Sequence, residues 1–407
     1  MRHREAPPRQ AERAGARTAC VRRRCRMTDL SVSKPRLLTR QFALVWALTF
    51  VTFFAAFQLF PTVPLRLREL GASLAESGRF MSLFTAGSAL GALFTGPLGD
   101  RVGHRRLVVT CALLYAGFLA AYALMPVRWG FYLLAFPHGV VWSGLLTATL
   151  ASLAHVLPED RRADGMSLYG LASPGGVIFG PLLGMWIFQH WGFAPIGWYL
   201  ALLFLLLGAL GSILPKDHPH GRAEGFKWPD AVVLAPCMVL FCVALGYGAL
   251  GSYTAQEGLA LGMPLPSAFL SFMAVGMVLM RIAMVKRGFG KRPIRKLPGM
   301  LIGAFAGMAL LAALPGGMAR HMASALLYGA GYSMLHTLLN AKLLESVDPQ
   351  RRGSAFGALL FAFDSGIGLG SFTLGWVIGH HGYRMGWALG ALAMLAALPV
   401  ALKLGRD

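Results

Sequence analysis

Acidic residues are scarce in this sequence: aspartate and glutamate account for 17 of 407 residues, and charged residues of either sign for only 14%. Soluble domains average about 25% charged residues, whereas 56% of this chain is hydrophobic. The composition therefore excludes a soluble globular protein and indicates a chain that crosses a membrane many times.

Several chemical signatures are missing as well. The chain contains neither a glycine-rich phosphate-binding loop nor a histidine–glutamate–x–x–histidine helix, which argues against ATP as the driving force and against a zinc enzyme. Its five cysteines show neither a disulfide framework nor a paired metal-binding spacing. We therefore expect no metal, no cofactor and no enzymatic activity. An intramembrane enzyme that uses His138, His336 and Asp364 with a metal is the remote alternative.

Long apolar segments are abundant instead. From residue 42 onward, twelve segments are long enough, at about 20 residues each, to cross a bilayer as helices. They cover approximately residues 42–62, 79–98, 106–125, 129–154, 164–189, 195–214, 230–252, 266–286, 297–314, 319–343, 353–379 and 384–404. The sequence therefore predicts an all-α integral membrane protein with twelve transmembrane helices.

Polar stretches divide the chain. Residues 1–26 form an arginine-rich tail, which we expect to be disordered or to precede the true start, and residues 27–40 form a cytoplasmic lead. The only long polar linker, residues 215–229, separates six predicted spans in residues 41–214 from six in residues 230–407. We therefore expect two six-helix bundles.

The distribution of lysine and arginine predicts the orientation. The net charge is +21, but the basic residues gather in every second loop, which is the pattern of membrane orientation and not of nucleic-acid binding. Those loops carry Arg101, Arg105, Arg106, Arg161, Arg162, Lys216, Arg222, Lys227, Lys286, Arg287, Lys291, Arg292, Arg295, Lys296, Arg351 and Arg352. The opposite loops hold Arg66, Arg68, Arg79, Arg128, Arg320 and Arg384. We expect a multi-pass protein of the inner cell membrane with both termini cytoplasmic, in contact with lipid and not with nucleic acid.

The two halves look like copies of each other. Residues 157–192 align without a gap with residues 347–382 at an offset of 190, and the same offset continues backward. The aligned pairs include Gly139 and Gly329, Gly176 and Gly366, Gly180 and Gly370, Trp186 and Trp376, and His190 and His380. An internal repeat of this length is typical of transporters that place a substrate path between two related bundles.

A stretch between the second and third spans is dense in glycine and arginine. It reads Gly96-Pro97-Leu98-Gly99-Asp100-Arg101-Val102-Gly103-His104-Arg105-Arg106. It is too polar for hydrocarbon and too short for a domain, so we expect a tight loop at the membrane surface. The stretch resembles the signature loop between helices 2 and 3 of the major facilitator superfamily of secondary transporters.

That resemblance implies two pseudo-symmetric six-helix bundles, a small-molecule substrate and transport by alternating access. It also implies a cytoplasmic latch that would close against the start of the eleventh helix, near Gly353 and Ser354. The residues of this latch would be Gly96, Asp100, Arg101, Gly103, Arg105 and Arg106.

Asp364 is the clearest candidate for chemistry inside the bilayer. It lies in a glycine-rich stretch twelve residues after Arg352, which is about 18 Å of helix rise and therefore close to the bilayer midplane. Burial there favours the neutral, protonated carboxyl group. We expect Asp364 to carry the coupling proton or to pair with a cationic substrate. Alternatively, it is a neutral acid that caps a local kink.

Two histidines also lie inside predicted spans. His138 and Gly139 match the polar–glycine pair of the family's fourth-helix motif, but Ala135 stands where that motif has arginine. Either His138 has taken over proton coupling, or it is a packing residue. His336 shares a helix face with Asn340, and the pair either lines the path or bonds to a neighbouring helix.

Three polar residues near span ends are expected to reach solvent. Arg281 should extend its charged end to the lipid–water interface. Gln58 and Glu257 lie near outer span ends and should form solvated rims, although Gln58 is kept as a weak transport candidate.

The fifth span carries Gly176, Gly180, Pro181 and Gly184, which make a smooth face with a proline that can bend the helix. We expect a hinge there. The pattern is similar to the family's helix-5 export signature, but Ser167 and Met185 replace two of its glycines.

These features predict a monomeric secondary transporter of small organic molecules, similar to the bacterial drug and metabolite efflux branch of the family, with proton-driven antiport as the first hypothesis. The alternative is proton-coupled or facilitated uptake of a metabolite or organic anion, which the missing arginine at Ala135 favours.

Overall fold

A computed structural model describes residues 38–158, 162–215, 231–287, 292–347 and 352–406, and within these ranges every ordered element is a helix. The long helices of the first half are α2 (Arg40–Glu69), α4 (Arg79–Val102), α5 (His104–Leu124), α6 (Arg128–Val156), α8 (Ala172–Trp191) and α9 (Ala194–Gly211). Those of the second half are α10 (Leu234–Ala260), α11 (Ala268–Arg287), α12 (Leu297–Ala313), α13 (Met318–Ser346), α14 (Arg352–His381) and α15 (Tyr383–Ala396). Short pieces are α3 (Leu74–Ser77), α7 (Arg162–Tyr169), η2 (Ala231–Val233), η3 (Pro293–Lys296) and α16 (Leu398–Arg406).

The prediction of twelve spans is confirmed, because one long helix lies on each predicted segment. Ten spans of the described region are long and apolar enough to cross a membrane on composition alone. The other two, α8 and α13, occupy the fifth and tenth segments and pack along α2 and α11. The predicted tail at residues 1–26 and the predicted linker at residues 215–229 lie almost wholly outside the described residues.

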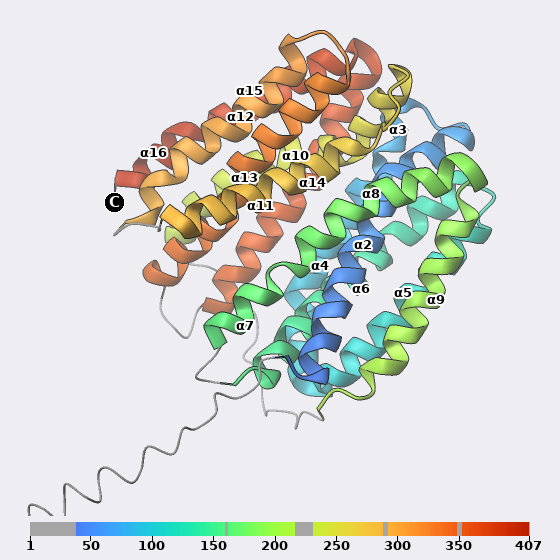
Figure 1. The fold of residues 1–407 in the computed structure, drawn as a ribbon, viewed down its shortest axis with the longest axis vertical. Helices are drawn as coiled ribbons and strands as arrows, with labels where there is room; N and C mark the ends of the chain where they lie inside the picture. The colour runs from blue at the N-terminus through green and yellow to red at the C-terminus, as the bar shows by residue number, and fades with distance from the viewer. Residues whose placement is uncertain (1–37, 159–161, 216–230, 288–291, 348–351, 407) are drawn as a thin grey trace, which may run out of the picture.

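The helices form two bundles that lie side by side, one coloured blue to green and the other yellow to red (Figure 1). Between the bundles, α4 packs along α14, α8 along α11, and α2 against α10. Large apolar side chains cover the outside, for example Leu133 (77% exposed) and Phe94 (68% exposed). An apolar exterior of this kind is expected for helices that face lipid hydrocarbon.

The internal repeat appears in the packing of the two bundles. A Cβ atom at Gly139 would overlap the carbonyl of Phe84 where α6 crosses α4, and one at Gly329 would overlap the carbonyl of Met273 where α13 crosses α11. These are equivalent contacts in the two halves. Small residues at such crossings allow the helix backbones to touch, which is how membrane helices gain packing energy.

We predict opposite effects of alanine at two glycines. Gly139→Ala should destabilise the protein by about 3 kcal/mol, because the carbonyl of Phe84 belongs to a helix backbone and cannot move aside. Gly117→Ala should be neutral or stabilising, because no atom lies within 4 Å of the added Cβ and alanine favours the helix. Thermal unfolding of the two purified variants in detergent checks this. Equal melting temperatures would contradict the assigned crossing.

The glycine- and arginine-rich stretch is less of a loop than predicted. Helix α4 continues to Val102 and α5 begins at His104, so Gly103 is the only non-helical residue between them. Its φ of +90° lies in the region that only glycine adopts without strain. The prediction of a loop over residues 96–106 was therefore wrong, because a helix can carry these polar residues once it passes the membrane surface.

Candidate functional site

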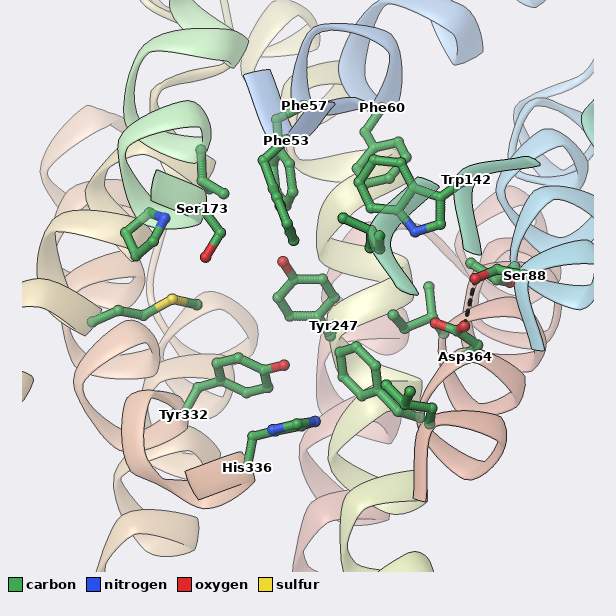
Figure 2. A pocket seen from close by; sticks show the side chains of 18 of the residues that line it. Phe53, Phe57, Phe60, Ser88, Trp142, Ser173, Tyr247, Tyr332, His336 and Asp364 are labelled. Atoms are coloured by element: carbon green, nitrogen blue, oxygen red, sulfur yellow. Dashed lines mark hydrogen bonds between the residues drawn. The ribbon is translucent and has the colours of Figure 1, made fainter. Parts of the chain in front are cut away.

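A cavity of about 410 Å³ lies between the two bundles. Its walls are mainly apolar and carry many aromatic side chains (Figure 2). The first bundle contributes Phe53, Phe57, Phe60, Phe84 and Trp142, and the second contributes Tyr247, Tyr332 and Phe363. A cavity of this size, mostly apolar and with a few polar groups, is typical of small-molecule sites.

Asp364 of α14 lines this cavity and is the one carboxylate among its described lining residues. Its Oδ2 accepts a hydrogen bond of 2.7 Å from the hydroxyl of Ser88 in α4, so the bond crosses from one bundle to the other (Figure 2). Residues 88 and 364 are 276 positions apart, and no pattern in the sequence singles out Ser88.

The glycines around Asp364 are explained by close helix contacts. A Cβ at Gly366 or Gly370 would meet backbone carbonyls of α10, and one at Gly368 would lie 2.5 Å from Oγ1 of Thr85 in α4. The carbonyl of Gly368 also accepts a 2.8 Å hydrogen bond from Ser82. Helix α14 is therefore pressed between its own bundle and α4. Asp364 lies within this contact, and α14 is unbroken there, so a capped kink is not needed to explain the acid.

Arg281 also lines the cavity, which corrects the prediction that it reaches the lipid–water interface. Its Nη1 donates a 3.2 Å hydrogen bond to the carbonyl of Gly170, at the junction between α7 and α8. That carbonyl has no helical partner, because the residue four positions further along is Pro174, which has no backbone N–H. The arginine therefore turns inward, toward the other bundle.

The other predicted transport residues divide between the cavity and the bundle interiors. His336 lines the cavity and lies beside Phe363, while Asn340 donates a 2.7 Å hydrogen bond to its Nδ1. His138 does not line it. Its ring is fully buried among aromatic side chains such as Tyr115, and its Nδ1 lies 3.3 Å from the hydroxyl of Tyr122. This surrounding corresponds to the packing interpretation of His138.

Gln58 and Glu257 are not solvated rims. Gln58 is fully buried and accepts a hydrogen bond from the hydroxyl of Tyr199. Glu257 is 4% exposed, and its carboxylate contacts Nη2 of Arg320 at 2.6 Å. Arg320 in turn lies inside α13 and not in a loop. Both predictions were wrong because the position of each residue in the membrane was judged from the end of its apolar segment. Helices α2 and α10 continue past those ends.

The carboxylate of Glu257 is the centre of a buried cluster. Nε1 of Trp387 donates to its Oε2 at 3.0 Å, and Nε2 of His321 lies 3.4 Å from the same oxygen. The four residues come from α10, α13 and α15, and each is at most 6% exposed. The cluster lies outside the residues that line the cavity and joins three helices of one bundle.

The bundles are linked on the side of the cavity nearest α3. Ser371 donates to the carbonyl of Gly78 at 3.0 Å, Gln256 to the hydroxyl of Ser77 at 3.0 Å, and Ser267 to the carbonyl of Pro181 at 2.8 Å. We call this region the α3 end, and the opposite one, which carries Asp100 to Arg106, the basic end.

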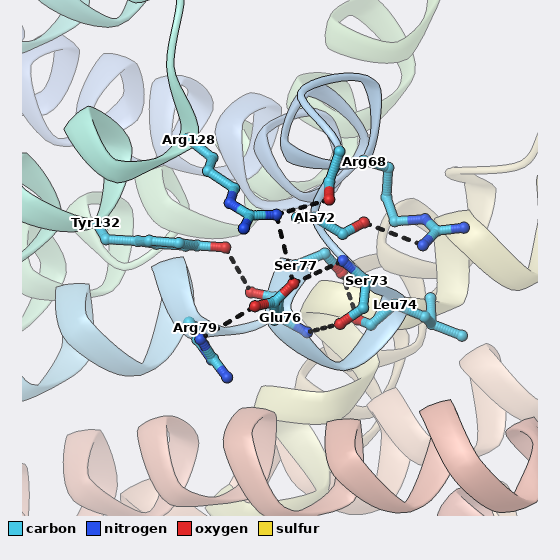
Figure 3. A network of polar contacts seen from close by, with 10 residues as sticks. Arg68, Ala72, Ser73, Leu74, Glu76, Ser77, Arg79, Arg128 and Tyr132 are labelled. Atoms are coloured by element: carbon cyan, nitrogen blue, oxygen red, sulfur yellow. Dashed lines mark hydrogen bonds and ion pairs between the residues drawn. The ribbon is translucent and has the colours of Figure 1, made fainter.

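A polar network holds α3 itself in place (Figure 3). Ser73 and Glu76 cap each other's backbone N–H groups, and Glu76 also pairs with Arg79 and Arg128. Tyr132 donates to the carbonyl of Glu76. The segment that meets the second bundle is thereby anchored to the first.

The residues of the predicted latch lie at the basic end. Oδ1 of Asp100 is 3.4 Å from Nε2 of His104, and Arg101 and Arg106 are exposed. Gly96 has open space around it, and Arg105 is half-buried at the start of α5. The predicted partners Gly353 and Ser354 have side chains outside the described residues, so the closing contact stays a prediction.

The glycines of the fifth span form a packing surface, and the predicted hinge stays a prediction. Cβ atoms at Gly176, Gly180 and Gly184 would all meet α2, within 2.6 to 2.8 Å of its nearest atoms. Helix α8 runs without a break through Pro181. The interruption lies about ten residues earlier, at Gly170 and Leu171.

The profile of the Major Facilitator Superfamily matches residues 45–371. The chain belongs to this superfamily. It is therefore a multi-pass membrane protein of this superfamily.

Relatives with different names match this chain. The chain is 27% identical over 172 residues to multidrug resistance protein MdtG of Dickeya zeae, covering 41% of this chain and 42% of that one. It is 25% identical over 372 residues to the gentisate transporter of Corynebacterium glutamicum, covering 83% and 81%. The match to MdtG thus spans less than half the length of that relative. The structure of nucleoside transporter NupG (D323A mutant) superposes with a TM-score of 0.72 at 16% identity, covering 90% of this chain and all of that one, and shows the shared fold.

Proposed function

We propose that this protein exports small organic molecules in exchange for protons, by alternating exposure of the cavity between the two bundles. The observation that supports this most directly is the hydrogen bond between Ser88 and Asp364. A proton on the carboxylate of Asp364 changes the charge of the cavity and, at the same time, the hydrogen bond to Ser88 that joins the bundles. Proton binding and bundle movement are thereby coupled through a single group.

We further propose residues 41–214 and 230–407 as the two moving units of a monomer in the inner membrane, with the basic end cytoplasmic. At the α3 end, Arg66, Arg79 and Arg128 are paired with glutamates, while the basic end carries an excess of lysine and arginine. The positive-inside rule favours this orientation. The described conformation, joined at the α3 end, would then be the inward-facing one.

Export is the first hypothesis, supported by the partial helix-5 signature and by the name of MdtG. Uptake of an organic anion is the second candidate. It is favoured by Arg281, a cation in the cavity wall, and by the name of the gentisate transporter.

Purified protein in liposomes with an imposed pH gradient tests the proposal. A panel of organic cations, neutral molecules and anions is offered on each side of the membrane. We expect uphill movement of at least one compound that stops when a protonophore collapses the gradient. If the compound moves only downhill and at a rate independent of the pH gradient, proton coupling is refuted. If the compound accumulates in the direction in which protons flow, the protein catalyses proton-coupled uptake instead of exchange.

We predict that Asp100→Ala slows transport about tenfold with normal expression. The variant loses one charge-assisted hydrogen bond in the conformation in which the latch is closed, and this shifts the balance between the two alternating conformations. Glu345→Ala is the control and should transport normally, because Glu345 is an exposed acid at the C-terminal end of α13, at the basic end of the protein. Rates from the liposome assay and protein amounts in the membrane check this. An Asp100→Ala rate equal to that of the wild type would rule out the latch.

A further inference from the structure

Arg281 is a cation in the cavity wall, and the described residues supply no anionic partner for it. Among the described residues its one polar contact is the carbonyl of Gly170, and no carboxylate pairs with it. A guanidinium group has five N–H donors, so most of them are left without a protein acceptor. Removing such a charge from water is costly unless an anion or water compensates it.

The cavity also presents other donors that lack a protein acceptor. The indole N–H of Trp142 and the hydroxyls of Tyr247 and Tyr332 make no hydrogen bond in the part of the chain that the structure describes. Both tyrosine hydroxyls point into the cavity (Figure 2). The only carboxylate of the described wall, Asp364, already accepts from Ser88. Of these groups, the guanidinium of Arg281 and the indole N–H of Trp142 can only donate, which suits a ligand with acceptor atoms.

The rest of the wall suits a flat apolar body. Tyr247 and Tyr332 are stacked with ring centroids 5.1 Å apart, and Phe53 meets Trp142 edge to face at 5.3 Å. Aromatic walls of this kind bind ring systems by stacking and by edge contacts. A volume of about 410 Å³ admits a molecule of one or two fused rings with room for substituents.

We propose that the cavity binds an amphipathic organic anion, with its carboxylate against Arg281 and its ring system among the aromatic side chains. This inference rests on the second candidate of the proposed function, uptake of an organic anion, and specifies how the same site would bind it. Asp364 lies on another helix from Arg281, and a proton on it removes the one negative charge of the described wall. Entry of an anion and protonation of Asp364 then favour each other, so the anion and the proton would move together, as in the uptake candidate and not as in proton exchange.

Three probes of nearly equal shape test the charge preference: 2-naphthoate, neutral 2-naphthamide and 2-naphthylmethylammonium. Their affinities for the full-length protein in detergent are measured by isothermal titration calorimetry, with empty micelles as the blank. We expect naphthoate to bind at least about tenfold more tightly than the amide, as for a hydrogen-bonded ion pair. The ammonium should bind most weakly.

Variants test whether Arg281 causes the preference for naphthoate over the amide. Arg281→Gln should bring the naphthoate and amide affinities within about twofold, with the amide affinity unchanged as proof of an intact cavity, and Arg281→Lys should keep part of the preference. Arg384→Gln is the matched control, because Arg384 also donates to a backbone carbonyl but lies exposed and outside the cavity. It should keep the wild-type ratio.

The proposal is overturned if the ammonium binds most tightly, if none of the three probes binds to monodisperse protein, or if Arg281→Gln keeps the tenfold ratio. Measuring the flux of the same probes in proteoliposomes distinguishes failure of the anion site from failure of the proposed transport function. Naphthoate that binds at Arg281 but never crosses the membrane would retain the anion site and reject transport of this class. Flux of the ammonium alone would retain transport and reject the anion site.

Discussion

Glu257→Ala should lower the free energy of unfolding by about 3–5 kcal/mol, which is the usual cost of removing one partner from a buried ion pair. The reason is the environment of Arg320, which is 6% exposed and pairs with Glu257 at 2.6 Å. Without the carboxylate, the guanidinium keeps only its hydrogen bonds to the carbonyls of Leu311 and Leu314. The N–H of Trp387 loses its acceptor as well. A clear drop in melting temperature in detergent is the expected reading.

Two further variants separate this mechanism from a general effect of losing an acid. Glu69→Ala removes an exposed partner of Arg66 and should cost less than about 1 kcal/mol. The double variant Glu257→Gln with Arg320→Met removes both charges and should recover much of the lost stability. If Glu257→Ala and Glu69→Ala melt at the same temperature, the buried cluster does not stabilise the fold as described.

Segment length and apolarity were sufficient to predict the twelve helices, because any chain in hydrocarbon must satisfy its backbone within a helix. The repeat was also readable, since glycines at crossings such as Gly139 and Gly329 are required wherever two backbones touch. Depth within a helix was not readable from the apolar segments. Helix α10 extends to Ala260, past the apolar run that ends near residue 252, so Glu257 is enclosed by neighbouring helices.

Contacts between the halves could not be predicted from sequence either. Asp364 was placed near the middle of its helix by counting residues, but its partner Ser88 is one of many serines and comes from the other bundle. Arg281 was judged by its distance from a helix end. The direction it faces depends on the break between α7 and α8, where the Gly170 carbonyl accepts from Arg281. Gly170 and Pro174 mark that break in the sequence, but not which side chain reaches the carbonyl.

Asp364→Asn should abolish transport driven by a pH gradient, with a loss of at least about 20-fold, while downhill exchange of substrate continues. Asparagine has nearly the same shape and still accepts a hydrogen bond from Ser88, but it cannot bind and release a proton. The cavity then keeps a fixed charge through the whole cycle, so a proton gradient has no group through which to bias the two states. Initial rates in proteoliposomes with and without the gradient measure both activities.

Ser88→Ala is the variant that separates the proton from the hydrogen bond. It removes only the contact between α4 and α14, worth about 1–2 kcal/mol to an ionised acceptor, and leaves the carboxylate in the cavity. We expect slower transport that still follows the pH gradient, with its pH profile displaced because the ionised form of Asp364 has lost a donor. If Asp364→Asn retains gradient-driven uptake, the carboxylate does not carry the proton, and the contact with Ser88 is a structural link between the bundles.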